Sequence, residues 1–429
     1  MRKGTDKAAK DISRRDFMKA SAAVGAAAMF SGREKLFAQG TDKLRVGLTG
    51  CGGRGTGAAK DCVRSSENVE IVAMGDLFRN RLEGSLEDLK NEVGEHVSVT
   101  EEMMFEGFDA YKQVIATDVD MVILGTPPHF RPEHLKAAVE AGKHIFMEKP
   151  VAVDPVGIRS VIASSELAKQ KGLAIVAGTQ RRHQAHYLDI IKRIQQGDIG
   201  EIVGGQCYWN MGELWVVEKQ EGWSDMEWQC RNWLYFTWLS GDHIVEQHVH
   251  NLDVINWAIG SHPVQCMGMG GREVRTAPKF GNIFDHFAIE YEYPNGVRVL
   301  SMCRQTAGCN DQVSERLVGT NGQTYTDGSN GFIEGPNAYK YEGESPNPYE
   351  QEHTDLIASI RSGEPLNEGK RVAESTMTAI MGRMSAYTGR ALKWDWAMNA
   401  SKLDLSPARY EFYDLAVRPV SVPGKTQLV

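Results

Sequence analysis

Two patterns of apolar residues divide the chain after its first forty residues. Through residues 44–177, short apolar runs alternate with longer segments in which apolar residues recur at helical spacing. Short runs bounded by glycine or proline predict buried strands, and the longer segments predict helices. The predicted strands are residues 44–48, 69–74, 119–124, 144–147 and 173–177. Strands that alternate with helices predict an α/β fold with a doubly wound parallel sheet.

A different pattern follows in the second half of the chain. Residues 287–293 alternate apolar with polar side chains, residues 294–296 are Pro-Asn-Gly, and residues 297–302 form a second apolar stretch. Alternation with a period of two is typical of a strand with one buried face, and Pro-Asn-Gly is a turn sequence. We therefore predict an antiparallel hairpin here. Helices are predicted at residues 349–360 and 371–387.

The first 39 residues have the pattern of a targeting segment. Arg14 and Arg15, with Phe17 and Lys19 close behind, precede an Ala- and Gly-rich apolar run over residues 20–30. A basic region followed by a short apolar region is the layout of a secretory signal, and the arginine pair is similar to that of a twin-arginine export signal. A basic amphipathic helix is the alternative, which the lack of a polar face disfavours. We expect an exported, periplasmic protein.

The first predicted strand leads directly into the sequence Gly-Cys-Gly-Gly-Arg-Gly at positions 50–55. Its GxGxxG spacing is typical of a loop that binds a dinucleotide. Gly50 allows the tight turn, Gly52 lets the backbone approach a pyrophosphate, and Gly55 allows the helix to pack closely on the strand. Gly53 and Arg54 belong to the same expected cofactor loop.

Polar residues follow the predicted strands at their carboxyl ends. Asp76, Thr126, Lys149 and Gln180 each stand just after a strand. In a parallel sheet these ends meet at one edge, where nucleotides bind. Asp76 lies where a carboxylate bonds the ribose 2′-hydroxyl of NAD and repels a 2′-phosphate. NAD is therefore the expected cofactor, and two arginines shortly after Asp76 leave NADP open.

Three motifs resemble those of the glucose–fructose oxidoreductase/inositol dehydrogenase family, usually called Gfo/Idh/MocA. They are the glycine-rich loop, the Glu-Lys-Pro sequence at positions 148–150, and residues 250–260, in which His, Asp, Trp and Gly stand at fixed spacing. Residues 382–390 are similar to a segment of secreted bacterial members. The resemblance covers nearly all of the chain after residue 43.

The resemblance implies the rest of the fold and of the cofactor site. The family's second domain is an α+β unit with an open, mostly antiparallel sheet. We expect it over residues 181–429, after a signal over residues 1–39 and a nucleotide-binding domain over residues 43–180. Pro127, His129 and Glu148 join the expected cofactor site. Family members are often dimers or tetramers through the open sheet face, so we expect a homodimer or homotetramer.

The resemblance also implies a catalytic group. In the family, a lysine and an Asp-x-x-x-His pair surround the nicotinamide and the reacting carbon; here they are Lys149 and His250, with Glu246 in place of the aspartate. On one helix, Glu246, His250, Asp253 and Trp257 share a face. We expect His250 to act as general acid/base, Lys149 to polarise the substrate oxygen or relay its proton, and Glu246 to orient both. The alternatives are a packed histidine and a structural ion pair.

Six of the nine tryptophans lie within thirty residues, just before this catalytic segment. Flat aromatic faces bury the C–H faces of sugar rings, and neighbouring polar side chains bond hydroxyls. We expect Trp209, Arg231 and Trp233 to line a carbohydrate site. Arg182 and Asp253 are further expected substrate residues. Packing in the core is the alternative for several of the tryptophans.

Composition narrows the class of protein further. Of the 429 residues, 41% are hydrophobic and 24% charged, as in an ordinary globular protein of two or three domains. A net charge of −8 disfavours nucleic-acid binding, and the chain has no 18-residue apolar run to span a membrane. Seven scattered cysteines are expected to pack rather than pair. We expect no metal, because the histidines near Glu246 lack the HExxH spacing.

The sequence thus predicts an NAD(P)-dependent oxidoreductase that takes hydride from a secondary hydroxyl of a sugar, glycoside or cyclitol. Free NAD is scarce outside the cytoplasm, so the nicotinamide is expected to be tightly bound. The alternative is a redox-neutral cycle, in which the hydride returns after hydrolysis, elimination or epimerisation. Family hydrolases of that kind resemble α-N-acetylgalactosaminidases and lack the lysine present here as Lys149. A non-catalytic sugar-binding protein is the third possibility.

Overall fold

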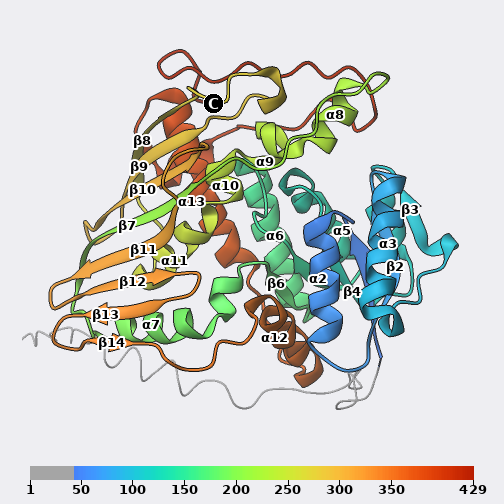
Figure 1. Cartoon of the computed structure of the whole chain (residues 1–429), viewed down its shortest axis with the longest axis horizontal. Coiled ribbons are helices and arrows are strands. Elements are labelled where there is room, and N and C mark those ends of the chain that lie inside the picture. The colour runs from blue at the N-terminus through green and yellow to red at the C-terminus, as the bar shows by residue number, and fades with distance from the viewer. Residues whose placement is uncertain (1–42) are drawn as a thin grey trace, which may run out of the picture. The chain divides into compact units, whose positions relative to one another are not determined.

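The computed structural model describes residues 43–429, and its first sheet has six parallel strands. Their order is β3-β2-β1-β4-β5-β6, the order of a doubly wound dinucleotide-binding sheet. Figure 1 labels four of these strands, β2, β3, β4 and β6. The strands are β1 (Leu44–Thr49), β2 (Val69–Asp76), β3 (Met104–Glu106), β4 (Met121–Leu124), β5 (His144–Met147) and β6 (Ile175–Ala177). The predicted α/β sheet is confirmed.

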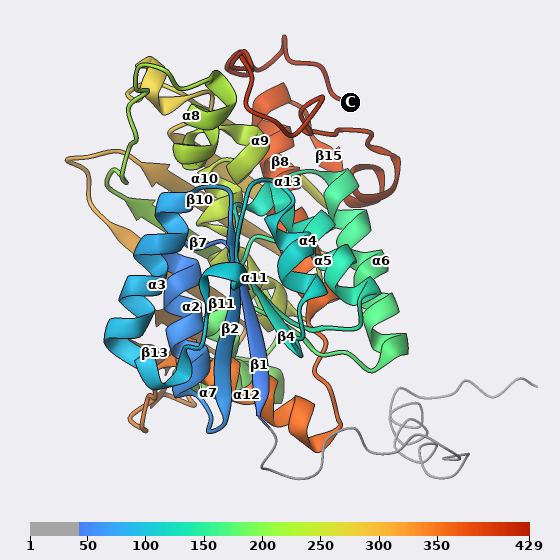
Figure 2. The ribbon, with the colours of Figure 1, turned by 90° about the vertical axis from the view of Figure 1, so that its right-hand side faces the viewer.

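Helices cover both faces of this sheet. Figure 2 shows α2 and α3 on one side of the strands and α4, α5 and α6 on the other. Their bounds are α2 (Gly53–Arg64), α3 (Arg79–Val93), α4 (Ala110–Ala116), α5 (Arg131–Glu140) and α6 (Pro155–Lys171). Each buries one stripe of side chains against the strands, as the helical spacing of apolar residues requires.

The second sheet has nine strands in the order β14-β13-β12-β11-β7-β10-β9-β8-β15. All neighbours are antiparallel except β7 and β10, which run parallel near the centre. The strands are β7 (Ile202–Met211), β8 (Gln265–Gly271), β9 (His286–Glu292), β10 (Arg298–Gln305), β11 (Gln312–Gly319), β12 (Gln323–Asp327), β13 (Gly331–Glu334), β14 (Tyr339–Lys340) and β15 (Leu392–Lys393). The predicted hairpin is β9–β10, and the mostly antiparallel α+β part is confirmed.

Helices pack on the inner face of the second sheet, and its outer face is open. These helices include α7 (Ala185–Gln196), α10 (His243–Glu246), α11 (Val249–Ile259) and α13 (Gly369–Thr388). On the outer face, Met267 is 64% and Met269 74% exposed, and Leu300 on the neighbouring hairpin is also exposed. The alternation of buried and exposed residues along β10 is that of a sheet with one covered face.

Helix α12 (Pro348–Ser362) returns to the first sheet, far from it in sequence. Its buried residues Leu356, Ile357 and Ile360 share a core with the side chains of β1, β2 and α2. Ile175 at the start of β6 also bridges to Asn367. The core of the nucleotide-binding sheet is therefore completed by residues from the end of the chain.

A sharp corner precedes α10. Gly241 has φ +79° and Asp242 has φ +73°, a conformation that few side chains other than glycine adopt. Arg383 Nη1 donates to the Gly241 carbonyl at 2.8 Å, and the Tyr387 hydroxyl donates to Asp242 Oδ2 at 2.5 Å. The segment at 382–390 that resembles secreted family members thus holds this corner from α13.

The prediction of one continuous helix through residues 246–257 is wrong. Helix α10 ends at Glu246 and α11 begins at Val249. The His243 carbonyl accepts from the N–H groups of both Gln247 and His248, at 2.9 and 3.2 Å, which closes the turn and stops the helix. The expected stripe from Glu246 to Trp257 is therefore divided between two short helices.

Three further observations concern the described part of the chain. No helix within residues 43–429 is long and apolar enough to cross a membrane. The seven cysteines all lie in this range, none is disulfide-bonded, and six of them are buried. The expected signal over residues 1–39 lies outside the described residues.

Candidate active site

The glycine-rich loop joins β1 to α2 through a close-packed corner. Gly50 has φ +94°, and a Cβ added there would lie 2.4 Å from the Thr126 backbone nitrogen. A Cβ on Gly55 would lie 1.8 Å from the Gly50 carbonyl oxygen, whereas one on Gly52 or Gly53 would meet nothing within 4 Å. The two outer glycines are required for packing, and the two between them border open space.

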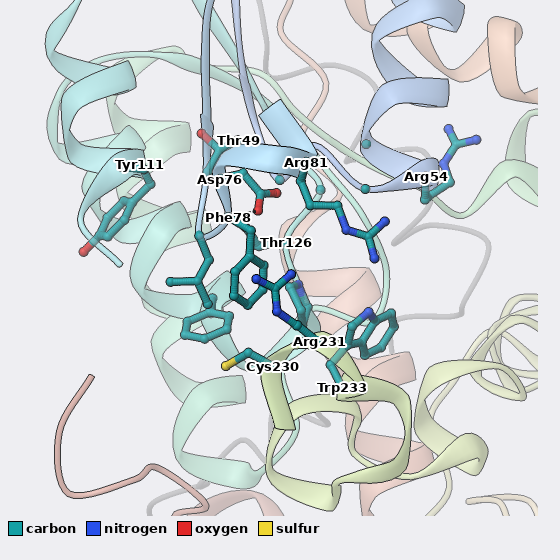
Figure 3. A pocket seen from close by; sticks show the side chains of 18 of the residues that line it. Thr49, Arg54, Asp76, Phe78, Arg81, Tyr111, Thr126, Cys230, Arg231 and Trp233 are labelled. Carbon is teal, nitrogen blue, oxygen red and sulfur yellow. Dashed lines mark hydrogen bonds between the residues drawn. The ribbon is translucent and has the colours of Figure 1, made fainter. Parts of the chain in front are cut away.

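That open space is part of a cavity of about 560 Å³ at the carboxyl ends of the strands. Its first wall consists of strand ends and the loops after them, and Figure 3 shows several of its side chains. The residues expected to bind cofactor that line the cavity are Gly50, Gly52, Gly53, Arg54, Gly55, Asp76, Thr126 and Pro127. The structure thus brings most of the expected cofactor residues to one surface.

Asp76 is held in place by backbone groups. Its Oδ2 accepts from Cys51 N at 2.7 Å and its Oδ1 accepts from Phe78 N at 2.9 Å. Burial raises the pKa of Asp76, and these two donors oppose the rise. Each oxygen keeps a lone pair for a hydroxyl. Thr49 Oγ1, which also lines the cavity, is buried without a hydrogen-bond partner in residues 43–429.

These features fit a dinucleotide. A cradle of two unobstructed glycines at a helix N-terminus accepts a pyrophosphate, and a fixed carboxylate at the end of β2 accepts a ribose hydroxyl.

A second cluster forms around Lys149. Its Nζ donates to the Glu246 carbonyl oxygen at 2.7 Å and lies 3.2 Å from Glu246 Oε1. In a continuous helix that carbonyl would accept from the N–H group of His250, but here His250 N donates to Gln247 O at 3.4 Å. The break between α10 and α11 therefore frees the carbonyl that fixes the lysine.

His250 lies beside this pair. Its ring stacks on Trp209, with centroids 5.6 Å apart and planes inclined by 20°. Burial, with the nearby charges of Lys149 and Arg181, lowers the pKa of His250 well below its usual value. The ring is therefore neutral near pH 7. His250 Nδ1 and Glu246 Oε2 are both buried and have no hydrogen-bond partner within the described residues.

Arg54 links the cluster to the cavity. It lines the cavity, and its Nε donates to Glu148 Oε1 at 2.6 Å, one residue before Lys149. Its guanidinium also lies 4.9 Å from the ring centroid of Tyr349 on α12, whose hydroxyl accepts from Gln180 Nε2 at 3.2 Å. Glu148 and Gln180 thus lie at the same edge of the sheet as the glycine loop.

Arg182 and Asp253, both expected to bind substrate, pair with each other. Arg182 Nε donates to Asp253 Oδ2 at 2.7 Å, and Arg371 and Ser375 bond the same carboxylate. These partners overcome the effect of burial and lower the pKa of Asp253 to about 2. Arg182 also lies 4.5 Å from the Trp257 ring centroid. The structure places the pair in an ion-pair network.

Three other expected residues lie apart from Lys149. His129 is buried, is not among the cavity's lining residues and bonds the Tyr410 hydroxyl at 2.8 Å; burial lowers its pKa to about 4. Arg231 and Trp233 line the same cavity as Asp76 (Figure 3), and Trp209 is not among the residues lining it.

Sequence reasoning missed several residues that shape the two sites. Tyr349 arrives from α12, Phe78 and Trp215 line the cavity, and Arg181 lies behind Trp209 with its guanidinium 5.6 Å from the indole centroid. No local pattern marks Tyr349 or Phe78, because each reaches its site through tertiary packing, whereas Trp215 belongs to the tryptophan-rich stretch and Arg181 directly follows Gln180 after β6. Within residues 43–429, no three His, Cys, Asp or Glu side chains are placed to hold a metal ion.

A doubly wound sheet, a glycine-rich loop with a fixed acidic partner, and a lysine–histidine cluster beside it define the class of dinucleotide-binding oxidoreductases. Comparison with known proteins agrees. Residues 44–179 match the description "Oxidoreductase family, NAD-binding Rossmann fold", residues 187–325 match the "GFO/IDH/MocA C-terminal domain", and residues 11–31 match a twin-arginine translocation signal. The chain belongs to the Gfo/Idh/MocA family and carries a twin-arginine signal sequence.

Relatives are distant. The chain is 23% identical over 288 residues to the scyllo-inositol 2-dehydrogenase (NAD(+)) of Bacillus subtilis (strain 168), covering 66% of this chain and 73% of that protein. It is 28% identical over 182 residues to the 2,7-anhydro-N-acetylneuraminate hydratase of Escherichia coli (strain K12), and the match covers 42% of this chain and 44% of the hydratase. Less than half of the hydratase's length is therefore matched.

The fold is shared with solved structures. An aldose-aldose oxidoreductase from Caulobacter crescentus, complexed with glycerol, aligns with a TM-score of 0.64 and 20% identity, over 82% of this chain and 99% of that one. An oxidoreductase domain protein from Kribbella flavida aligns with a TM-score of 0.67 and 16% identity, over 82% of this chain and 99% of that one. At these identities the likeness describes the fold.

Proposed function

We propose that this protein is an NAD-dependent dehydrogenase acting on a secondary hydroxyl of a sugar, glycoside or cyclitol. The observation that carries the proposal is the cluster of Lys149, Glu246 and His250. Its buried atoms Glu246 Oε2 and His250 Nδ1 have no hydrogen-bond partner among residues 43–429, and Arg54 and Glu148 connect it to the cavity. A buried polar atom without a hydrogen-bond partner lowers the stability of the folded protein unless a ligand supplies the missing hydrogen bond.

Each residue of the cluster has a separate role in the proposed oxidation of the alcohol. A bound nicotinamide supplies the hydride acceptor. His250, neutral because of its lowered pKa, accepts the hydroxyl proton. Lys149, fixed by the Glu246 carbonyl, polarises the substrate oxygen, and the second Glu246 oxygen bonds a neighbouring hydroxyl. Trp209 keeps His250 oriented and offers an apolar face to a sugar ring.

The choice of NAD over NADP rests on Asp76. Its carboxylate lies in the cavity and is fixed by two backbone donors, so a 2′-phosphate would meet a negative charge that cannot turn away. The exposed Arg81 lines the same cavity and reduces this discrimination. A modest preference for NAD is the expected result of a dinucleotide titration.

Substrate class, location and assembly complete the proposal. The relatives named for inositol and aldose support a polyhydroxylated ring substrate. The twin-arginine signal supports a periplasmic location. The exposed Met267 and Met269 on the outer sheet face support a homodimer or homotetramer, because a monomer rarely leaves such a patch open.

A redox-neutral reaction is the second candidate. The hydratase relative favours it, since its printed activity is not a net oxidation. In such a cycle the hydride returns to the substrate, so His250 and Lys149 would keep their proton-transfer and polarising roles. The two candidates differ in whether reduced cofactor accumulates.

The test follows the cofactor. The mature protein with NAD is mixed with a panel of cyclitols, monosaccharides and glycosides, and the absorbance of reduced nicotinamide is recorded. The expected result is lasting reduction that is at least a hundredfold slower in Lys149→Met and His250→Gln and unchanged in Lys136→Ala, a control on the exposed side of α5 that lines neither the cavity nor the outer sheet face. Glycoside cleavage or rearrangement without lasting reduction would replace dehydrogenation by the redox-neutral reaction. Failure of the protein to bind NAD or NADP would refute both.

A further inference from the structure

One wall of the cavity comes from the second half of the chain. The connection between β7 and α10 contains α8 (Asp225–Arg231), and residues from this connection face the strand ends across the cavity. They are Trp215, Val217, Cys230, Arg231 and Trp233. Figure 3 shows Arg231 and Trp233 reaching toward Asp76, Phe78 and Arg81 from the α8 side.

Arg231 closes the gap between the two walls. Its guanidinium lies 3.7 Å from the centroid of the Phe78 ring and 4.7 Å from that of Trp223, and its Nη1 lies 3.4 Å from Asn80 Oδ1. Glu227 on the same helix accepts from its Nε at 2.9 Å, which fixes the side chain in this direction. A contact between an arginine and an aromatic face is worth about 0.5–2 kcal/mol.

The C-terminal tail, residues 402–429, supports the same contact from behind. Phe412 lies parallel to Phe78, with ring centroids 6.0 Å apart, and 5.6 Å from Phe108 on the cavity wall. The tail also holds α8, since Gln229 Nε2 donates to the Leu415 carbonyl at 2.6 Å and Met226 N donates to that of Tyr413 at 3.0 Å. Figures 1 and 2 both show the tail and α8 at the same end of the molecule.

We propose that α8 and the C-terminal tail form a cover over the adenosine half of a bound dinucleotide and control how fast it leaves. Asp76 marks the position of the adenosine ribose, and Arg231 contacts the ring of Phe78 two residues further on. A ligand bound here is enclosed between the strand ends and the cover. It leaves only after the Arg231–Phe78 contact opens, and the tail opposes that opening. The inference rests on the dinucleotide site of the proposed function.

The cover explains how the protein would retain its cofactor without a contribution from Lys149, Glu246 or His250. The residues that form it lie apart from Lys149, Glu246 and His250. A change at Phe412, which supports the cover and is not among the residues lining the cavity, is therefore expected to alter the dissociation rate of the cofactor and to leave the chemical step intact. This separates the cover from a general loss of active-site structure.

The test measures dissociation directly. Protein loaded with NAD receives a large excess of isotopically labelled NAD, and the NAD retained after rapid desalting is analysed by mass spectrometry over time. Arg231→Ala and Phe412→Ala are each expected to raise the dissociation rate at least tenfold, with Lys136→Ala, on the exposed side of α5 and outside the cavity, as the control. Phe412 is 48% exposed, so its removal leaves the core intact, and a thermal unfolding curve verifies that each variant is folded.

The outcomes are distinct. Equal dissociation rates in wild-type protein and both cover variants would overturn the proposal. If NAD dissociates faster only from Arg231→Ala, then α8 alone retains the cofactor, and the proposed role of the C-terminal tail is wrong. If the protein holds NAD but oxidises no substrate in the panel, the cover is still tested while the dehydrogenase function fails. Wild-type protein that binds no dinucleotide would overturn both.

Discussion

His183 gives this protein a pH-dependent contribution to stability whose size follows from its surroundings. The residue lies just after β6 and is buried, with Nδ1 2.5 Å from Asp355 Oδ2 on α12 and Nε2 3.6 Å from Glu368 Oε1. Burial alone would lower its pKa, but the two carboxylates outweigh burial and raise the pKa to about 9. The charged imidazolium therefore ties α12 and the start of α13 to the nucleotide-binding sheet.

The direction and magnitude follow from linkage. Because the folded pKa is raised, the stabilisation is fully present below the unfolded value of about 6.5 and is lost as the pH rises through about 9. A difference of this size corresponds to about 3 kcal/mol. With an unfolding entropy of roughly 2.1 cal/mol/K per residue over roughly 390 residues, the loss is about 4 °C in Tm.

The assay compares wild-type protein with His183→Gln, which keeps a donor and has no charge. Thermal unfolding is recorded from pH 6 to pH 9.5. The wild-type protein is expected to exceed the variant by about 4 °C at pH 6.5, and the difference is expected to vanish near pH 9.5. Subtracting the variant removes the contribution of the titrating groups that do not interact with His183, and Asp355 and Glu368, whose pKa values are lowered, are ionised throughout this pH range. A difference in Tm that stays constant across this range would refute the charged histidine.

Two further predictions concern packing. Gly55→Ala places a Cβ 1.8 Å from the Gly50 carbonyl oxygen, so calorimetric titration with NAD is expected to show at least tenfold weaker binding. Gly84→Ala is the control, because a Cβ at Gly84 would meet nothing within 4 Å. Unaltered NAD binding in Gly55→Ala would contradict the close packing of Gly55 on Gly50. Arg181→Met leaves buried Glu315 without its charged partner, and denaturant unfolding is expected to show a loss of about 3–5 kcal/mol. A loss below about 1 kcal/mol would show that Asn251, Tyr187 and Thr326 satisfy Glu315 alone.

The sequence predicted the parts of the fold that depend on local pattern. Short apolar runs separated by helical segments were enough for five of the six parallel strands, and strict alternation with a turn was enough for the β9–β10 hairpin; the three-residue strand β3 (Met104–Glu106) at the sheet edge was not predicted, because so short a run carries no pattern. The glycine spacing located the loop because each glycine answers a local steric demand, as the 1.8 Å approach at Gly55 illustrates. Residues that follow parallel strands meet at one edge by geometry, which brought Asp76 and Thr126 to one cavity.

The sequence could not predict the features of the site that depend on tertiary packing. Helical spacing predicted one face from Glu246 to Trp257, but the turn at Gln247 and His248 divides it and turns a backbone carbonyl toward Lys149. Arg182 and Asp253 carry charges that suit a substrate, yet they neutralise each other, because their pairing depends on how α11 lies against the end of β6. Their expected roles in substrate binding, like those of the other site residues, remain predictions for the assays above.

The contribution of α12 to the first core bears on how the chain folds as it is synthesised. Leu356, Ile357 and Ile360 fill the side of the nucleotide-binding sheet lined by α2, and they emerge from the ribosome long after β6 is complete. The centre of the second sheet waits as well, since Gly204 on β7 pairs with Arg298 on β10, 94 residues later (298 − 204). The first core waits for residues 356–360 and the second sheet for α13, so a nascent chain exposes both unfinished cores until most of it has been translated. For a chain with a twin-arginine signal, whose route carries folded proteins, release from the ribosome and readiness for export then almost coincide.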